Sequence, residues 1–166
     1  MKLLIIRHGP AGDRSDWEAE GQDDRLRPLT AQGKSEIHKT ARVLARLVPR
    51  LDLLATSPFT RAVETADIVA SRYRCEAQPL DALTPDSAPD LLTPWLQQQP
   101  RDRTIAAVGH EPHLSTLVAY LLTGGRTSFL DLKKGGTCLL ELGVSPGPAS
   151  ATLCWLLTDT LLRRLE

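Results

Sequence analysis

The side chains best suited to chemistry in this sequence are two arginines, Arg7 and Arg61, and two histidines, His8 and His110. Together they are cationic and rich in N–H donors, and a guanidinium group can hold two oxygens of a phosphate at once. A neutral imidazole nitrogen can in addition attack as a nucleophile. If the four side chains meet, they would suit a phosphoryl group as their ligand.

Each of these residues also has an ordinary structural interpretation. Most arginines are surface charges, and a single histidine at a strand end is more often hydrogen-bonded into the structure than catalytic. Gly9 and Gly109, beside the two histidines, could be plain turn residues, although glycine also removes side-chain bulk where a ligand approaches the backbone. The chemical interpretation therefore depends on whether the chain brings the four residues together.

Three apolar runs of strand length precede these residues: Lys2–Ile6, Leu53–Ala55 and Thr104–Val108. Each ends in a polar or glycine-containing turn, which is typical of buried parallel strands. In an open α/β sheet, ligands bind outside the carboxyl ends of the strands. Since the arginines and histidines follow these runs directly or in the first turn of the next helix, the sequence predicts that they converge at one edge of a sheet.

Helical patterns lie between the runs. An apolar stripe predicts a helix over Ala31–Leu47. A second helix is expected over Ser57–Ser71, with Ser57 as its N-cap and Pro58 at the first helical position, and a third over Pro112–Gly124. The N-terminus of the second helix would offer free N–H groups to an anion.

Weaker strand candidates complete the pattern. They are Arg74–Leu80, Thr137–Leu142 and Ala151–Leu157, and the last two are expected to form a hairpin. The alternation of strands and helices predicts an α/β fold with a mostly parallel central sheet. A length of 166 residues with 42% hydrophobic residues is usual for one domain with its own core, so a single domain spanning residues 1–166 is expected.

Composition excludes several classes of protein. Lys plus Arg and Asp plus Glu both number 20, so the net charge is zero and nucleic acid is not an expected partner. Cys75, Cys138 and Cys154 are odd in number and lack C-x-x-C spacing, so we expect reduced core residues rather than disulfides or a zinc site. The apolar run Leu3–Ile6 is too short for a signal peptide or a membrane span, so we expect a cytoplasmic protein without a membrane partner.

Three motifs resemble those of the histidine phosphatase (phosphoglycerate mutase-like) superfamily. Leu4–Gly9 resembles its R-H-G signature, Ser57–Ala66 its second motif S-P-x-x-R-A-x-x-T-A, and Val108–His110 its third, in the same order. The resemblance extends from Met1 to about Gly124. It implies a three-layer fold, in which helices flank both faces of the sheet.

The resemblance also implies an activity and a role for each matching residue. His8 matches the nucleophile that becomes phosphorylated, and Arg7, Arg61 and His110 match the residues that hold the phosphoryl oxygens. The reaction implied is hydrolysis in two steps, with no metal or cofactor because the arginines supply the positive charge. The partner would be a phosphorylated protein or a small phosphate ester.

Two further segments narrow the resemblance. Arg27–Gly33, which reads R-P-L-T-x-x-G, and Gly109–Pro112 are similar to those of SixA-type bacterial phosphohistidine phosphatases, which are also small. The chain lacks the long insertions that cover the pocket in the mutases of the superfamily. An open cleft would suit a phosphohistidine carried by a protein, so phosphohistidine phosphatase is the function we expect.

A general acid is the least defined part of the site. Larger superfamily members use a glutamate after the second motif to protonate the leaving group, and the corresponding stretch here is Leu80–Asp86. Asp81 is the nearest carboxylate, followed by Asp86 and Glu111, and each could equally be a solvated loop residue.

Two other functions remain open. One is a phosphatase for small phosphate esters on the same scaffold, because fold does not determine substrate. The other is a phosphate-binding module without catalysis, against which the presence of His8 argues.

Overall fold

The computed structural model describes residues 1–166 and contains a six-stranded sheet with strand order β3-β2-β4-β1-β5-β6. Its strands are β1 (Lys2–Arg7), β2 (Leu53–Thr56), β3 (Ala77–Pro79), β4 (Thr104–Gly109), β5 (Thr137–Leu142) and β6 (Ala151–Leu157). β1, β2, β3 and β4 run parallel, whereas β5 pairs antiparallel with both β1 and β6. The predicted α/β fold with a mostly parallel sheet is confirmed, and so is the hairpin.

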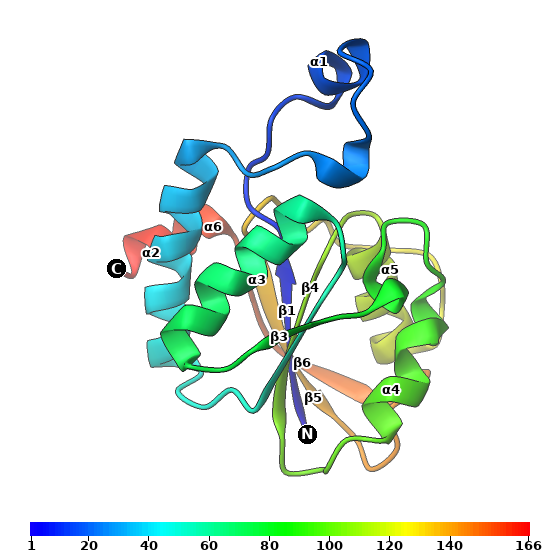
Figure 1. The fold of residues 1–166 in the computed structure, drawn as a ribbon. Helices are drawn as coiled ribbons and strands as arrows, with labels where there is room; N and C mark the ends of the chain where they lie inside the picture. Colours follow the sequence, from blue (N-terminus) through cyan, green and yellow to red (C-terminus); the bar gives the residue numbers. More distant parts are fainter.

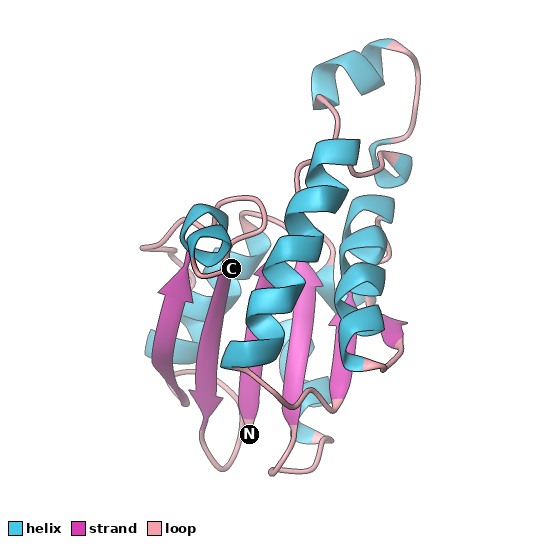
Figure 2. Cartoon of the chain, turned by 90° about the vertical axis from the view of Figure 1, so that its left-hand side faces the viewer, coloured by secondary structure: helices cyan, strands magenta, loops and turns pink.

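Helices cover both faces of the sheet and form three layers with it (Figures 1 and 2). One face carries α2 (Ala31–Leu47), α3 (Thr60–Tyr73) and α6 (Asp159–Arg164). The other carries α4 (Thr93–Gln97), α5 (His113–Thr123) and the short 3-10 helices η2 (Asp81–Leu83) and η3 (Pro89–Leu92). No helix of this structure is long and apolar enough to span a bilayer.

The apolar strands are buried on both sides because successive side chains point to opposite faces. In β1, Leu4 and Ile6 pack into the core under α2 and α3, whereas Leu3 and Ile5 pack into the core under α5. All four are fully buried. This is why the run reads as continuously apolar rather than alternating, and why its carboxyl end, at Arg7 and His8, is held rigidly.

The second helix begins later than its sequence predicts. It starts at Thr60, with Phe59 as N-cap, and not at Ser57. The backbone N–H of Ser57 donates to the carbonyl of Val108 at 2.9 Å, so Ser57 still belongs to the sheet pairing. Its hydroxyl accepts a bond from the N–H of Phe59, which makes a local turn ahead of the helix rather than a helix cap.

Two other expectations need correction. Only Ala77–Pro79 of the expected strand Arg74–Leu80 is a strand, because Arg74 ends α3 in a left-handed conformation with φ of 57°. The three cysteines are free, as expected, but only Cys138 is buried, and Cys154 is exposed on β6, which lies at the edge of the sheet.

An arm, residues 11–30, leaves the sheet after β1 and projects beyond its carboxyl edge (Figure 1). It contains α1 (Arg14–Ala19) and the 3-10 helix η1 (Asp24–Leu26), and returns at Thr30, the N-cap of α2. The base of the arm is narrow: a Cβ on Gly33 would lie 2.0 Å from the carbonyl oxygen of Pro10, so only glycine fits there. The arm therefore rises directly beside the end of β1.

Candidate active site

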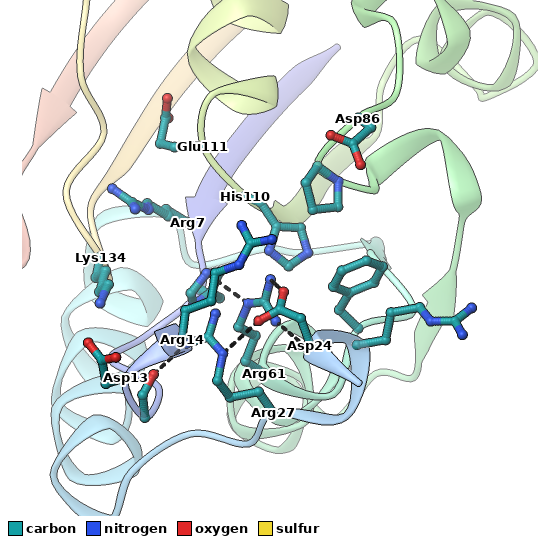
Figure 3. Close-up of a pocket in the computed structure, with 15 residues that line it drawn as sticks. Arg7, Asp13, Arg14, Asp24, Arg27, Arg61, Asp86, His110, Glu111 and Lys134 are labelled. Carbon is teal, nitrogen blue, oxygen red and sulfur yellow. Dashed lines mark hydrogen bonds and ion pairs between the residues drawn. The ribbon is translucent and has the colours of Figure 1, made fainter. Parts of the chain in front are cut away.

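A cavity of about 450 Å³ opens at the carboxyl edge of the sheet, and Arg7, His8, Arg61 and His110 all line it (Figure 3). The remaining lining residues are Gly12, Asp13, Arg14, Asp24, Arg25, Arg27, Phe59, Pro85, Asp86, Glu111 and Lys134. The lining includes six arginine or lysine side chains and four carboxylates, and Phe59 is its one large apolar side chain. The structure thus brings the four predicted residues together in a polar pocket that favours an anion.

His8 is held as a neutral imidazole. The residue is 5% exposed, and its Nδ1 lies 2.7 Å from the carbonyl oxygen of Gly9. Because a carbonyl oxygen can only accept, Nδ1 carries the hydrogen. Burial lowers the pKa of His8 to about 3; the bond to Gly9 opposes this effect, and the charges of Arg61 and Arg7 add to it. The lone pair is therefore on Nε2.

Arg61 faces that lone pair from the first turn of α3. Its Nε–H donates to Nε2 of His8 at 3.3 Å. One turn further along α3, the hydroxyl of Thr65 donates to the carbonyl of Arg61 at 2.7 Å and accepts from the N–H of Gly9 at 3.1 Å. Thr65 thereby ties the loop of the histidine to the helix of the arginine, although sequence reasoning had given it no role.

The arm contributes two residues that the sequence analysis did not place in the site, Asp24 and Arg27. The Asp24 carboxylate accepts from Arg27 Nε at 2.8 Å and from the terminal nitrogen Nη2 of Arg61 at 3.0 Å, and its carbonyl accepts from Nη1 of Arg61 at 2.7 Å. Burial alone would raise the pKa of Asp24, but its bond to Arg27 and the nearby arginine charges hold that pKa below its ordinary value. An ionised Asp24 thus joins the two guanidinium groups.

Arg7 closes another side of the pocket from the end of β1. It donates from Nη1 to the carbonyl of Leu132 at 2.6 Å, while its buried Nε–H has no partner in the protein. Lys134, on the same loop as Leu132, also lines the cavity. Arg7 is thus anchored on one side and has donor capacity left for a ligand.

His110 lies against His8, with 5.0 Å between the ring centroids and 57° between the ring planes. It is 2% exposed, and burial lowers its pKa to about 2, so this ring is neutral too. The Nε2 of His110 is 2.8 Å from the hydroxyl oxygen of Ser57. The ring of Phe59 packs edge-on against the ring of His110, with 5.1 Å between the ring centroids.

The structure changes the expected ranking of the candidate general acids. Asp81, the first candidate for a general acid, does not line the cavity, because η2 buries Leu83 in the core and leaves Asp81 at its start exposed to solvent. Asp86 and Glu111 do line it. Burial raises the pKa of Glu111, whose Oε2 accepts from Ser115 at 2.5 Å and whose buried Oε1 has no partner.

The one carboxylate of the motif Ser57–Ala66 supports the site from outside. Glu64 accepts from the backbone N–H of Leu29 at 2.7 Å and from Lys34 at 2.6 Å. It therefore fixes the point at which the arm returns to α2. The chain brings together no group of three side chains that could ligate a metal ion.

Comparisons with known proteins agree with this geometry. Residues 3–84 match the family model of the histidine phosphatase superfamily (branch 1). An uncharacterized protein of Picosynechococcus is 31% identical over 87% of both chains. The phosphohistidine phosphatase SixA of Escherichia coli is 29% identical over 75% of this chain and 76% of its own length. The solved structure of the protein histidine phosphatase SixA complexed with tungstate covers all of both chains, with a TM-score of 0.83 at 25% identity.

Proposed function

Given that this chain belongs to the histidine phosphatase superfamily and is thus a phosphatase, we propose that it removes the phosphoryl group from a phosphohistidine carried by another protein. The observation that carries the chemistry is the lone pair of His8 Nε2, which faces a pocket of arginines. A buried neutral imidazole is a nucleophile that needs no proton removed before it attacks.

In the first step, His8 Nε2 attacks phosphorus in line with the leaving nitrogen. The new P–N bond forms while the bond to the substrate imidazole breaks, and that imidazole takes its proton from solvent. The guanidinium groups of Arg7, Arg27 and Arg61 and the N–H of His110 lie around the pocket, where they would neutralise the charge that spreads over the equatorial oxygens.

In the second step, water attacks the phosphorylated His8. The P–N bond breaks, its electron pair returns to Nε2, and inorganic phosphate leaves with one proton of the water while the other proton passes to solvent. The same donors serve both steps, since the phosphoryl group stays in one place while the entering and leaving groups change.

The arrangement of the carboxylates supports phosphohistidine as the substrate class. An alkyl phosphate expels a basic alkoxide, and a positioned acid typically accelerates such a step by about 10²–10⁴. An imidazole, with an ordinary pKa of about 6.5, can leave after taking a proton from solvent. Among the carboxylates that line the pocket, Asp24 is committed to two arginines and Asp13 caps the N-terminus of α1. Asp86 is exposed, and Ser115 holds one oxygen of Glu111. Asp81 lies outside the pocket.

A panel of substrates tests the proposal. We expect kcat/KM to be highest for a phosphohistidine protein or peptide, intermediate for p-nitrophenyl phosphate, whose leaving group needs little protonation, and lowest for alkyl phosphates such as phosphoserine. Comparable or higher kcat/KM values for alkyl phosphates would overturn it.

One observation favours a second candidate, a phosphatase for small esters. Glu111 lines the pocket and its pKa is raised, which is what a general acid requires. Against this, Figure 3 shows its carboxyl group pointing away from His110 and Arg61, and Ser115 holds one of its oxygens. The same panel, applied to a Glu111 variant, separates the two candidates.

A further inference from the structure

We propose that Ser57 is a positioning residue that keeps the hydrogen of the His110 ring on Nδ1, so that this ring donates to an oxygen of the bound phosphoryl group. The inference deepens the proposed function, because it assumes that the pocket holds a phosphoryl group. It does not depend on which molecule carries that group.

Ser57 is rigidly held where β2 ends. It is fully buried, its N–H donates to the carbonyl of Val108 at 2.9 Å, and its carbonyl accepts from the hydroxyl of Thr56 at 3.1 Å. The hydroxyl oxygen of Ser57 accepts from the N–H of Phe59 at 3.3 Å and lies 2.8 Å from His110 Nε2. These two contacts are the whole hydrogen-bonding environment of that hydroxyl.

Counting hydrogens decides the direction of the bond between the two side chains. A serine hydroxyl has one hydrogen to donate, and the N–H of Phe59 can only donate. In the protein alone, either direction leaves one buried hydrogen without an acceptor: the hydroxyl hydrogen of Ser57 if His110 Nε2 donates, or the Nδ1 hydrogen of His110 if Nε2 accepts. Because His110 lines the pocket and Ser57 does not, only the Nδ1 hydrogen can find its acceptor on a bound phosphoryl group. The hydroxyl therefore donates to Nε2 of His110.

The single hydrogen of the neutral His110 ring must then be on Nδ1. That atom is buried and has no partner in the protein, although His110 lines the pocket and packs against the His8 ring. An N–H without a protein acceptor is suited to a phosphoryl oxygen. The opposite tautomer would turn a lone pair toward that oxygen, and the two would repel each other.

The two histidines thus have the same tautomer but different tasks. In His8, the carbonyl of Gly9 takes the hydrogen of Nδ1 and leaves the lone pair of Nε2 to attack. In His110, the hydroxyl of Ser57 takes up the lone pair of Nε2 and leaves the hydrogen of Nδ1 to bind. The acceptor beside His8 thus makes that ring a nucleophile, and the donor beside His110 makes that ring a ligand for an anion, although the two rings are chemically identical.

Nitrogen NMR of the ¹⁵N-histidine-labelled full-length protein tests the proposal directly, because the two tautomers give different long-range coupling patterns. With the His110 signals identified by their loss in His110→Gln, we expect Nδ1–H in the wild type and an increased share of Nε2–H in Ser57→Ala. An Nε2–H ring in the wild type, or an unchanged tautomer in Ser57→Ala, would overturn the proposal.

Kinetics with p-nitrophenyl phosphate test whether Ser57 acts through His110. We expect Ser57→Ala to lose about 10-fold in kcat/KM in the wild-type background and less than about 2-fold in the His110→Gln background. Equal losses in both backgrounds would show a role independent of His110 and contradict the proposal. Thr40→Ser, which alters another buried hydroxyl residue that does not line the cavity, is the control and should keep wild-type activity.

The tautomer measurement also separates this proposal from the proposed function. If the substrate panel favoured alkyl phosphates, the NMR result would be unaffected. Conversely, a wrong tautomer at His110 would leave the phosphohistidine preference standing.

Discussion

The Nε–H of Arg61 points at Nε2 of His8 across 3.3 Å, so the guanidinium group is within reach of the atom that would attack phosphorus. The proposed nucleophile and a proposed anion-binding group are therefore hydrogen-bonded to each other. When a phosphoryl group enters the pocket, one of its oxygens can replace the lone pair of His8 as the acceptor of the Arg61 hydrogen bond.

Replacing His8, the proposed nucleophile, should abolish turnover. We expect His8→Ala to keep less than a tenth of the wild-type kcat on p-nitrophenyl phosphate, because no other neutral ring presents its lone pair to the pocket. The wild type should acquire an acid-labile, base-stable phosphoryl label that the variant lacks. His38→Ala, at an exposed histidine of α2, is the control and should be fully active. Turnover by His8→Ala at a tenth or more of the wild-type rate would contradict the assignment.

Arg61→Lys should lower activity, because it retains the positive charge but loses the planar set of donors of the guanidinium group. The guanidinium of Arg61 uses Nε toward His8 and both terminal nitrogens toward Asp24, a geometry that an ammonium group does not reproduce. We expect a loss of at least about 10-fold in kcat/KM, or about 1.4 kcal/mol of transition-state stabilisation. Arg72→Lys, at an exposed position of the same helix, serves as the comparison. Near-normal activity of Arg61→Lys would refute a bidentate role.

Asp24→Asn should separate binding from catalysis. The substitution keeps the shape of the side chain but removes the charge that orients Arg27 and Arg61. Because the pocket becomes more positive, inorganic phosphate should bind at least as tightly, whereas kcat should fall by about 10-fold as the arginines lose their alignment. Phosphate titrations and steady-state kinetics give the two quantities, with exposed Asp23→Asn as the matched control. An unchanged kcat would show that the arginines are aligned without Asp24.

Substituting Glu111 should distinguish the two candidate substrate classes. If the substrate is phosphohistidine, Glu111→Gln should change kcat/KM on a phosphohistidine peptide by less than about 5-fold. Asp81→Asn, which alters a carboxylate outside the cavity, should behave like the wild type on every substrate. Efficient hydrolysis of alkyl phosphates that Glu111→Gln removes selectively would instead identify a small-ester phosphatase with Glu111 as its acid.

Stability should fall as pH falls below the ordinary histidine pKa of 6.5, because burial lowers the pKa values of His8, His110 and His113 to about 3, 2 and 4. Between pH 6.5 and about 5 the unfolded chain binds protons at these histidines and the folded chain does not. Each histidine should therefore reduce the free energy of unfolding by up to about 1.4 kcal/mol per pH unit. Glu111, with its raised pKa, opposes this in part.

Urea unfolding at several pH values measures this slope. His113→Leu should make it shallower, because His113 is buried, both of its ring nitrogens lack partners and it does not line the cavity. The stabilisation that comes from the lowered pKa of Asp24 is lost only as pH falls below the ordinary aspartate value of 3.8, so it does not affect the slope in this window. A slope that is the same in the variant and the wild type would show that His113 is protonated in the folded protein.

Much of the fold and the central residues of the site follow from local patterns in the sequence. The helix Ala31–Leu47 and the strands Thr137–Leu142 and Ala151–Leu157 have the predicted bounds, because periodicity of apolar residues and turn residues act over a few neighbours. Arg7 and His8 could be placed because a buried parallel strand must end beside its neighbours, whatever the rest of the chain does.

The tertiary structure decided which polar side chains complete that site. Asp24 and Arg61 are 37 residues apart and meet only because the arm folds over the carboxyl edge of the sheet. Asp81 and Glu111 carry the same chemical group, and the direction of the chain after each strand decides which one lines the pocket. The start of the second helix at Thr60 depends likewise on the pairing of Ser57 with β4, a contact between segments distant in sequence. Spacing along the chain encodes local periodicity, whereas such contacts depend on packing between elements that no local pattern specifies.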